Sequence, residues 1–256
     1  MRLIVHAGFH KTGTSSVQHT LNANKSALSE EFRIYLREDL RPTCEAARAV
    51  SIANDPLAMG AVTYEWAQFL ATIDPDDPRP IVISAEDLAG HMPGRHDLIR
   101  YGATPAIMAT MSTVVSEYLP NYQPQLFFST RAPAEWVQSC YGQHLRATRM
   151  TDDLATYHTK MMPHADLDTI VDAVSAAVPG VPVASARLED SAKHALGPVS
   201  ALLDLMRPNP DLRARLKAIA PRNRALPTET MAEFLRLNRS NMNRADLSRA
   251  KKALLP

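Results

Sequence analysis

The stretch that decides the fold is HAGFHKTGTSS (His6–Ser16), which directly follows the opening residues MRLIV. Apolar, β-branched residues that stop at a glycine are typical of a buried strand, so we expect a strand over Arg2–His6. Ser16–Leu28 then carries apolar residues at helical spacing, which predicts a helix capped by Thr14 or Ser15. A strand, a glycine loop and a helix in this order form the setting in which a loop can bind a phosphate-like anion.

The loop differs from the phosphate loop of nucleoside triphosphatases, G-x-x-x-x-G-K-[ST], because its lysine precedes the second glycine. Gly8 and Gly13 permit backbone conformations that other residues avoid. The N–H groups from Lys11 to Ser16 are expected to face an anion at the amino end of the helix, and Lys11 adds a full positive charge. Hydroxyl donors are expected from Thr12, Thr14, Ser15 and Ser16. The alternative is a glycine turn that only joins strand to helix.

The remaining elements follow from the same periodicities. Further buried strands are predicted over Ile81–Ser84, Gln125–Thr130 and Val183–Ala186. Helices are predicted over Cys44–Ala53, Ala61–Ile73, Thr104–Leu119, a segment that begins at Pro133, Asp166–Val178, Pro198–Met206 and Thr228–Leu237. Strands that alternate with helices predict an α/β fold, a single three-layer domain over residues 1–256 with a central, mainly parallel sheet flanked by helices. The first loop further favours a P-loop nucleoside triphosphate hydrolase-like arrangement.

Polar side chains follow three of the predicted strands, in His6–Lys11, at Glu86 and at Arg131. Ligands of parallel sheets gather at the carboxyl ends of the strands, so we expect these groups to share one edge. Residues 29–80 and 89–124 are longer excursions that we expect on the acceptor side of the site. The chain closes in a basic tail, residues 244–252.

Composition restricts the class of protein. The chain has 256 residues, 45% hydrophobic and 21% charged, with a net charge of +1, so no general attraction to nucleic acid or membranes is implied. Two cysteines, Cys44 and Cys140, form no metal or disulfide pattern. No apolar run approaches the roughly 18 to 20 residues of a membrane span, and the start is too short for a signal peptide. The expectation is a soluble, cytoplasmic protein with a local anion site.

Two motifs together resemble those of sulfotransferases that use 3′-phosphoadenosine 5′-phosphosulfate (PAPS), including the bacterial-type family. HAGFHKTGTSSVQ is similar to the family's 5′-phosphosulfate loop, in which lysine precedes glycine. LFFSTRAPAEWVQSCYGQHLR (Leu126–Arg146) is similar to its 3′-phosphate motif, an arginine after a strand and a serine eight residues later. By this resemblance the 3′-phosphate is bound by Arg131 and Ser139. The phosphosulfate is bound by His10, Lys11, Thr12, Gly13, Thr14, Ser15 and Ser16.

The spacing of the second motif also makes physical sense. Arg131 leaves a strand end, Pro133 starts a helix, and Ser139 lies about 9 Å along it. A guanidinium and a hydroxyl placed in this way can take opposite sides of one phosphate. The alternative is a surface arginine and an unrelated helical serine.

A third segment, PRNRALPTETMAEFLRL (Pro221–Leu237), is similar to a basic loop that closes over the nucleotide in the family. By this resemblance Arg222 and Arg224 contact the 3′-phosphate. A solvated turn followed by an amphipathic helix explains the same residues.

The resemblance implies sulfuryl transfer from PAPS to a hydroxyl or amine, with 3′,5′-ADP as product and no metal required. Lys11 is expected to stabilise the leaving phosphate, since such transfer depends on alignment and fixed positive charge. The acceptor's proton needs a base, for which Glu86 is the first candidate and His10 the second. Glu86 could instead cap a short helix and His10 could pack in the loop. Weaker candidates are His91 and His96, which we expect to be exposed, and Glu38 and Asp39.

Two other functions stay open. A P-loop small-molecule kinase would explain the loop and the acidic end of IVISAED, although the G-K-[ST] order is absent. A nucleotide-binding protein without turnover is the other, because binding and catalysis are separate properties. The acceptor, a carbohydrate among others, and the oligomeric state cannot be predicted from the sequence.

Overall fold

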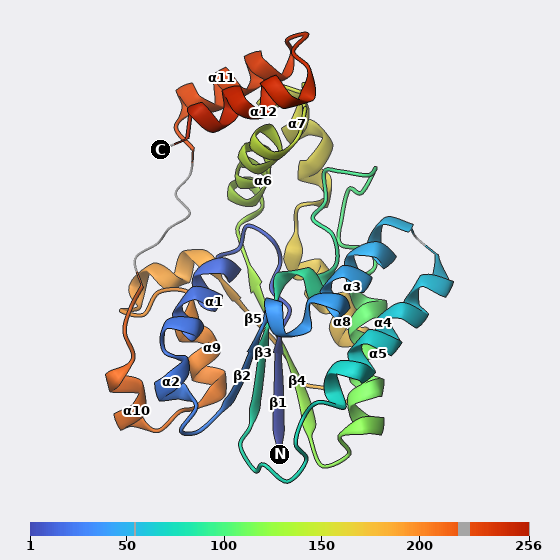
Figure 1. Ribbon diagram of the computed structural model, residues 1–256, viewed down its shortest axis with the longest axis vertical. Coiled ribbons are helices and arrows are strands. Elements are labelled where there is room, and N and C mark those ends of the chain that lie inside the picture. The colour runs from blue at the N-terminus through green and yellow to red at the C-terminus, as the bar shows by residue number, and fades with distance from the viewer. Residues whose placement is uncertain (54, 220–225, 256) are drawn as a thin grey trace.

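The computed structural model describes residues 1–53, 55–219 and 226–255. At its centre lies a five-stranded sheet in which every strand is parallel to its neighbours, in the order β2-β3-β1-β4-β5 (Figure 1). The strands are β1 (Arg2–His6), β2 (Arg33–Leu36), β3 (Ile81–Ser84), β4 (Gln123–Thr130) and β5 (Val183–Arg187). The first strand is therefore central, and the loop that follows it emerges between the carboxyl ends of β3 and β4.

Helices cover both faces of the sheet and its carboxyl edge (Figure 1). One face carries α1 (Thr14–Ala23), α2 (Lys25–Leu28), α9 (Val199–Met206) and α10 (Pro210–Arg215). The other carries α3 (Arg41–Ala53), α4 (Met59–Leu70), α5 (Thr104–Tyr118) and α8 (Leu167–Ala177). Beyond the carboxyl edge lie α6 (Pro133–Ala147), α7 (Leu154–Met161), α11 (Thr228–Asn238) and α12 (Arg244–Ala253). In the described part of the chain, no helix has the length and apolarity to cross a membrane.

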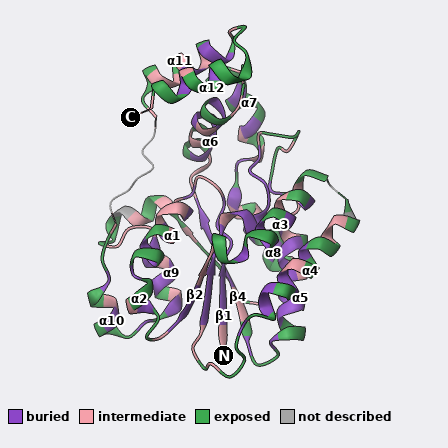
Figure 2. Ribbon diagram, viewed as in Figure 1, coloured by how far each residue is buried: buried purple, intermediate pink, exposed green. Residues whose placement is uncertain are grey.

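Alternating side chains of β1 explain the three layers. Leu3 and Val5 join the larger apolar core with α3, α4 and α5, whereas Ile4 joins the smaller core with α1 and α9. All three side chains are almost completely buried, and Figure 2 shows the strands buried between the helical layers. A sheet covered on both faces is the expected state of parallel strands. The predicted α/β fold with three layers and a parallel sheet is therefore confirmed.

The four predicted strands are present, but the sequence analysis missed β2. This strand has only four residues and begins with a charged one, Arg33, which divides Phe32 from the three apolar residues that follow. Folding compensates that charge, because the guanidinium donates to the backbone oxygens of Asp74 and Arg79 and lies 3.7 Å from the Asp77 carboxylate. A charged residue can then start a buried strand at the edge of the sheet.

The helix after the loop was predicted with the wrong cap and as one piece. It begins at Thr14 with Gly13 as its N-cap, and no side chain caps it. It is interrupted at Asn24, whose amide donates to the backbone oxygens of Thr20 and Lys217. The same side chain accepts from the Lys217 N–H at 2.8 Å. A residue read as helical instead fixes a distant segment that lines the site.

The predicted basic tail is the helix α12, so that prediction was wrong. Asn243 caps it by accepting from the Asp246 N–H at 3.0 Å, a local signal that the charge run concealed. Lys251 is buried, and its ammonium donates to the backbone oxygens of Leu145 and Thr148 at 2.5 and 2.6 Å. These are carbonyl groups at the end of α6, where helices leave oxygens unpaired. The C-terminal helices thereby secure one wall of the site.

Candidate functional site

A buried histidine ties the three central strands together beneath the loop. His6 Nδ1 lies 2.8 Å from Ser84 Oγ on β3, and Nε2 lies 2.8 Å from Ser129 Oγ on β4. Burial lowers the pKa of His6 to about 3, so the ring is neutral and bonds one serine as donor and the other as acceptor. A Cβ at Gly8 would lie 2.6 Å from His6 Nε2. His6 therefore supports the loop from below rather than facing a ligand.

The loop above it has the geometry of an anion-binding turn. Lys11 has φ 68° and Gly13 has φ 90°, both in the left-handed region, and a Cβ at Gly13 would lie 2.6 Å from Leu188 Cδ1. The backbone N–H groups from Lys11 to Ser15 donate to no atom of the described residues. Unpaired, successive N–H groups at a helix start are suited to bind the oxygens of a phosphate or sulfate.

The four loop hydroxyls divide into two kinds. Thr12 and Thr14 are buried and donate to the Phe9 backbone oxygen at 2.6 and 3.1 Å, so they hold the loop in shape. The resemblance implied that Thr12 binds the ligand. In the structure its hydroxyl donates to Phe9 instead of facing the cavity. Ser15 and Ser16 are partly exposed and line the large cavity described next.

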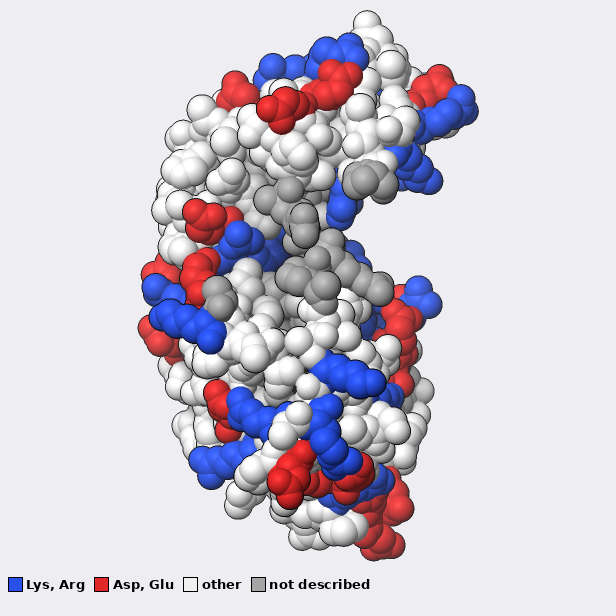
Figure 3. Space-filling view, turned by 90° about the vertical axis from the view of Figure 1, so that its left-hand side faces the viewer, with Lys and Arg blue, Asp and Glu red and all other residues white. Residues whose placement is uncertain are grey.

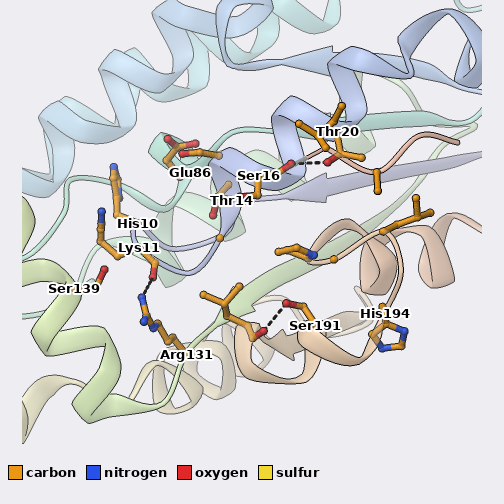
Figure 4. A pocket seen from close by; sticks show the side chains of 18 of the residues that line it. His10, Lys11, Thr14, Ser16, Thr20, Glu86, Arg131, Ser139, Ser191 and His194 are labelled. Carbon is orange, nitrogen blue, oxygen red and sulfur yellow. Dashed lines mark hydrogen bonds between the residues drawn. The ribbon is translucent and has the colours of Figure 1, made fainter. Parts of the chain in front are cut away.

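A cavity of about 860 Å³ lies over the carboxyl edge of the sheet. In Figure 3 the molecule is hollowed between the C-terminal helices and the body that holds the sheet, with Lys and Arg side chains at the edges of the hollow. Figure 4 shows side chains from separate elements facing it. Of the residues predicted from sequence, it is lined by His10, Lys11, Gly13, Thr14, Ser15, Ser16, Glu86, Arg131 and Ser139. Arg222 and Arg224 lie outside the described residues.

Arg131 joins the two predicted motifs directly. Its Nη1 donates to the Lys11 backbone oxygen at 3.2 Å (Figure 4). Glu189 and Glu135 lie 3.7 and 3.8 Å from the guanidinium. Its Nε is buried and makes no hydrogen bond to any described residue. A buried guanidinium N–H that makes no full hydrogen bond is costly, and the Glu189 carboxylate stays 3.7 Å from this one, so the donor fits an anion that would lie here.

Lys11 supplies the second positive charge. Across residues 1–53, 55–219 and 226–255, no carboxylate lies within 4 Å of its ammonium. Burial lowers the pKa of Lys11, and the positive charges of Arg146 and Arg131 lower it further, while Cys140 opposes them. Mutual repulsion among cations that share a cavity is relieved by a bound anion.

His10 holds the loop through a hydrogen-bond network. Its ring bonds Tyr101 OH through Nδ1 at 3.0 Å and Asp87 through Nε2 at 3.1 Å. Its backbone N–H donates to Tyr101 OH, and its backbone oxygen accepts from Trp136 Nε1 at 2.9 Å. Burial opposes the charge on Asp87, but hydrogen bonds from His10 and Arg37 keep the pKa of Asp87 at about 2. Both ring nitrogens of His10 are engaged, so the geometry favours positioning of Lys11 over proton transfer.

Glu86 is the carboxylate among the described residues that line the cavity. It is the first residue of a short 3-10 helix (Glu86–Ala89) and does not cap it, because the N-cap is Ala85 and no side-chain cap bond forms. One oxygen, Oε2, accepts a hydrogen bond from the Gln18 amide of α1. Its other oxygen has no hydrogen-bond partner among the described residues. Glu86 thus has one fixed oxygen and one available oxygen.

The weaker base candidates are placed elsewhere. His91 is buried and its Nδ1 lies 2.8 Å from the Met92 backbone oxygen, so the expectation of an exposed ring was wrong for it. His96 is exposed, as expected. Glu38 pairs with Arg37, and Asp39 accepts from the Leu36 N–H; neither is among the described residues that line the cavity.

Sequence reasoning missed several lining residues. Gln143 and Arg146 follow Ser139 by four and seven residues on α6, a helical spacing that could have identified them. The segments after β5 and after α10 carried no motif, and their contribution depends on tertiary folding. They supply Leu188, Ser191, His194, Ala195, Leu196, Gly197, Pro198, Ala218 and Ile219, and Figure 4 labels Ser191 and His194 on this wall.

Comparison with known proteins found no family model, curated protein or solved structure that matches this chain. The function is therefore inferred from the cavity and the residues that line it.

Proposed function

We propose that this protein is a PAPS-dependent sulfotransferase with a P-loop-like α/β fold, which transfers a sulfuryl group to a hydroxyl or amine. One observation carries the proposal: the Lys11 loop and Arg131 meet at one cavity, where Arg131 Nη1 donates to the Lys11 backbone oxygen. Two cationic motifs that are 120 residues apart thus line one space. Its volume of about 860 Å³ falls within the usual range for small-molecule sites.

The residues fit the two charged ends of PAPS. The phosphosulfate would be held by the Lys11 ammonium, by the hydroxyls of Ser15 and Ser16, and by the N–H groups from Lys11 to Ser15, which donate to no described residue. The 3′-phosphate would be held by the hydroxyl of Ser139 and by the guanidinium of Arg131, whose Nε makes no hydrogen bond to a described residue. In this arrangement the anion replaces Glu189 and Glu135 as the partner of Arg131.

The chemistry asked of the chain is alignment and charge stabilisation. A bond forms between the acceptor oxygen or nitrogen and sulfur, and the bond from sulfur to the bridging phosphate oxygen breaks. Lys11 would stabilise the electron pair that leaves on that oxygen, and the product nucleotide is 3′,5′-ADP. Glu86 would take the acceptor's proton on its available oxygen, while Gln18 holds the other.

A small-molecule kinase is the competing enzyme. Its metal would need a carboxylate after β3, where Glu86 and Asp87 are the candidates, and Glu86 already accepts a hydrogen bond from Gln18. Asp87 is buried and already bonds His10 and Arg37, with Arg48 at 3.7 Å. This arrangement favours a structural role for Asp87 and gives the kinase less support.

Ligand-induced stabilisation separates the candidates. A ligand at 100 times its Kd stabilises a protein by about 2.7 kcal/mol. We expect 3′,5′-ADP to raise the melting temperature without magnesium, and ATP to raise it much less. A rise with Mg-ATP alone would establish the kinase. Binding of 3′,5′-ADP with no sulfation across a broad acceptor panel would establish the non-catalytic protein.

Variants of Arg131 test the shared cavity. Arg131→Gln should weaken 3′,5′-ADP binding about 100-fold, since a charge-assisted bidentate contact is lost. Arg249→Gln is the matched control, because Arg249 is exposed on α12 and pairs only with Asp246 among the described residues. Equal affinity of the Arg131 variant and the control would remove the 3′-phosphate assignment.

A further inference from the structure

Helix α6 presents a row of polar side chains to the cavity that extends beyond the residues used for the donor. Ser139, Gln143 and Arg146 all line it, at positions i, i+4 and i+7 of the helix. Arg146 therefore lies about 10 Å along the helix from Ser139. The two residues are separated by nearly two turns of helix, and the Arg146 guanidinium bonds Gln143 between them, so Arg146 is not one of the two residues assigned to the 3′-phosphate.

Within the described part of the chain, Arg146 has no carboxylate partner. Its Nη2 donates to Gln143 Oε1 at 2.7 Å, and no acidic side chain of the described chain lies within 4 Å of it. Lys11 and Arg131 have assigned anions in the proposed function, whereas Arg146 has none. Gln143 holds the guanidinium without neutralising it, so Arg146 keeps its full charge at the cavity.

A second segment of the chain contacts α6 in this region. The segment after β3 packs on α6, because a Cβ at Gly94 would lie 2.4 Å from His144 Cε1. Met92 of this segment lines the cavity, and Arg95 follows it by three residues. Burial lowers the pKa of His144 to about 4, with Arg95 the next largest cause, so positive charge from this segment reaches α6.

The balance of charge in the cavity also favours an anionic ligand near Arg146. Its described lining includes three basic side chains, Lys11, Arg131 and Arg146, and one carboxylate, Glu86. A neutral acceptor would leave Arg146 unpaired beside other cations, whereas an anionic acceptor would neutralise it.

We propose that Arg146, held by Gln143, binds a carboxylate or sulfate group of the acceptor, so that the enzyme sulfates anionic hydroxyl or amine compounds in preference to neutral ones. This inference rests on the proposed sulfotransferase function. It assigns Arg146 to acceptor specificity, and it makes Gln143 a positioning residue.

Binding in the presence of the product nucleotide tests this assignment. The protein is saturated with 3′,5′-ADP, which occupies the donor cations, and calorimetry compares two matched pairs of probes. The first pair is a tetrasaccharide of alternating glucuronate and N-acetylglucosamine against chitotetraose. The second is 4-hydroxyphenylacetate against 4-hydroxyphenethyl alcohol. We expect the charged member of at least one pair to bind at least tenfold more tightly, with a preference that decreases as salt rises.

Variants of Arg146 test whether this residue causes the preference for charged probes. Arg146→Gln should abolish it, Arg146→Lys should keep part of it, and Arg249→Gln should leave it unchanged. The affinity for 3′,5′-ADP should stay within twofold in all three. Equal binding of charged and neutral probes in both pairs would overturn the inference, and so would a preference that survives Arg146→Gln.

Two outcomes separate this inference from the proposed function. If Arg146→Gln weakens 3′,5′-ADP binding as much as Arg131→Gln does, Arg146 belongs to the donor site and the acceptor assignment fails alone. If the wild-type protein does not bind 3′,5′-ADP, the proposed function fails, and the same probes without nucleotide still decide whether Arg146 is an anion site.

Discussion

The loop after β1 and helix α6 face each other across the cavity, yet contacts of different range hold them. The turn of the loop itself is fixed by its neighbours, because Thr12 and Thr14 bond Phe9 and Gly13 caps the helix, while distant segments hold His10 and the Lys11 backbone oxygen. Helix α6 is held at its far end by Lys251, which lies about 100 residues away in the chain. Contacts between neighbouring residues can be predicted from a short sequence motif, whereas contacts between distant residues cannot. Variants of the loop and of the residues that hold α6 test the two kinds of contact separately.

The largest effect is expected from a substitution in the loop that lowers activity and leaves the structure unchanged. Lys11→Ala should lower kcat for sulfuryl transfer about 1,000-fold, the upper range for loss of one group that stabilises developing charge. The melting temperature should stay close to that of the wild type, because Lys11 makes no ion pair within the described chain. Turnover at the wild-type rate would exclude Lys11 from the reaction.

The next largest effect is expected from His6, the buried residue beneath the loop, on the pH dependence of the free energy of unfolding. The unfolded chain binds a proton at His6 near pH 6.5, whereas the folded protein takes it up only near pH 3. Between these values the unfolded state binds more protons, so the free energy of unfolding should fall as pH falls. The loss from pH 6.5 to pH 4 is about 3 kcal/mol for this group.

Urea unfolding at several pH values measures the effect. His6→Asn should flatten the pH dependence between pH 6.5 and 4, and His158→Asn, at an exposed position, should not. The same slope in wild type and His6→Asn would contradict the neutral buried ring.

Substitutions of two glycines test whether the backbone is constrained at Gly13 and unconstrained at Gly60. Gly13→Ala should destabilise the protein by about 2 kcal/mol, because φ is 90° and the new Cβ would lie 2.6 Å from Leu188 Cδ1. Gly60→Ala, in α4 with nothing within 4 Å of the new Cβ, should stabilise it by about 0.5–1 kcal/mol. Thermal unfolding of both variants measures the contrast, and equal shifts would show that the loop is not constrained as described.

The smallest effect concerns the far end of α6. Lys251→Met should destabilise the protein by about 1 kcal/mol, since the hydrogen bonds to the Leu145 and Thr148 oxygens are lost while the apolar stem is kept. Lys252→Met, its exposed neighbour, should change stability by less than about 0.5 kcal/mol. Chemical denaturation of the pair measures the difference, and indistinguishable values would mean that Lys251 does not secure α6.

These contrasts explain how much the sequence predicted. Four strands and the order of strand, loop and helix were predictable, because apolar runs and glycines act locally. The short strand at Arg33 was not, since its charge is compensated by oxygens of Asp74 and Arg79 about 40 residues away. The helix at Arg244 was hidden by its charge, although its Asn243 cap was visible in the sequence.

The candidate site divides in the same way. Lys11, Arg131 and Ser139 belong to recognisable motifs, and the structure brings them to one cavity. The engagement of His10 by Asp87 and Tyr101 could not be read from spacing, because it depends on how three separate segments pack. The wall formed after β5 likewise has no motif and depends on the sheet order.

Helix α6 is fastened at both ends to parts of the molecule that have separate tasks. Near its start the Trp136 indole donates to the His10 backbone oxygen, one residue before Lys11, and at its end Lys251 holds the last carbonyls. A displacement of α12 would therefore act on a helix whose opposite end bonds His10, the residue before Lys11. A purification tag or a fused domain at the C-terminus would act on α12 and, through Lys251, on α6. Such attachments should be placed at the other terminus when activity is measured.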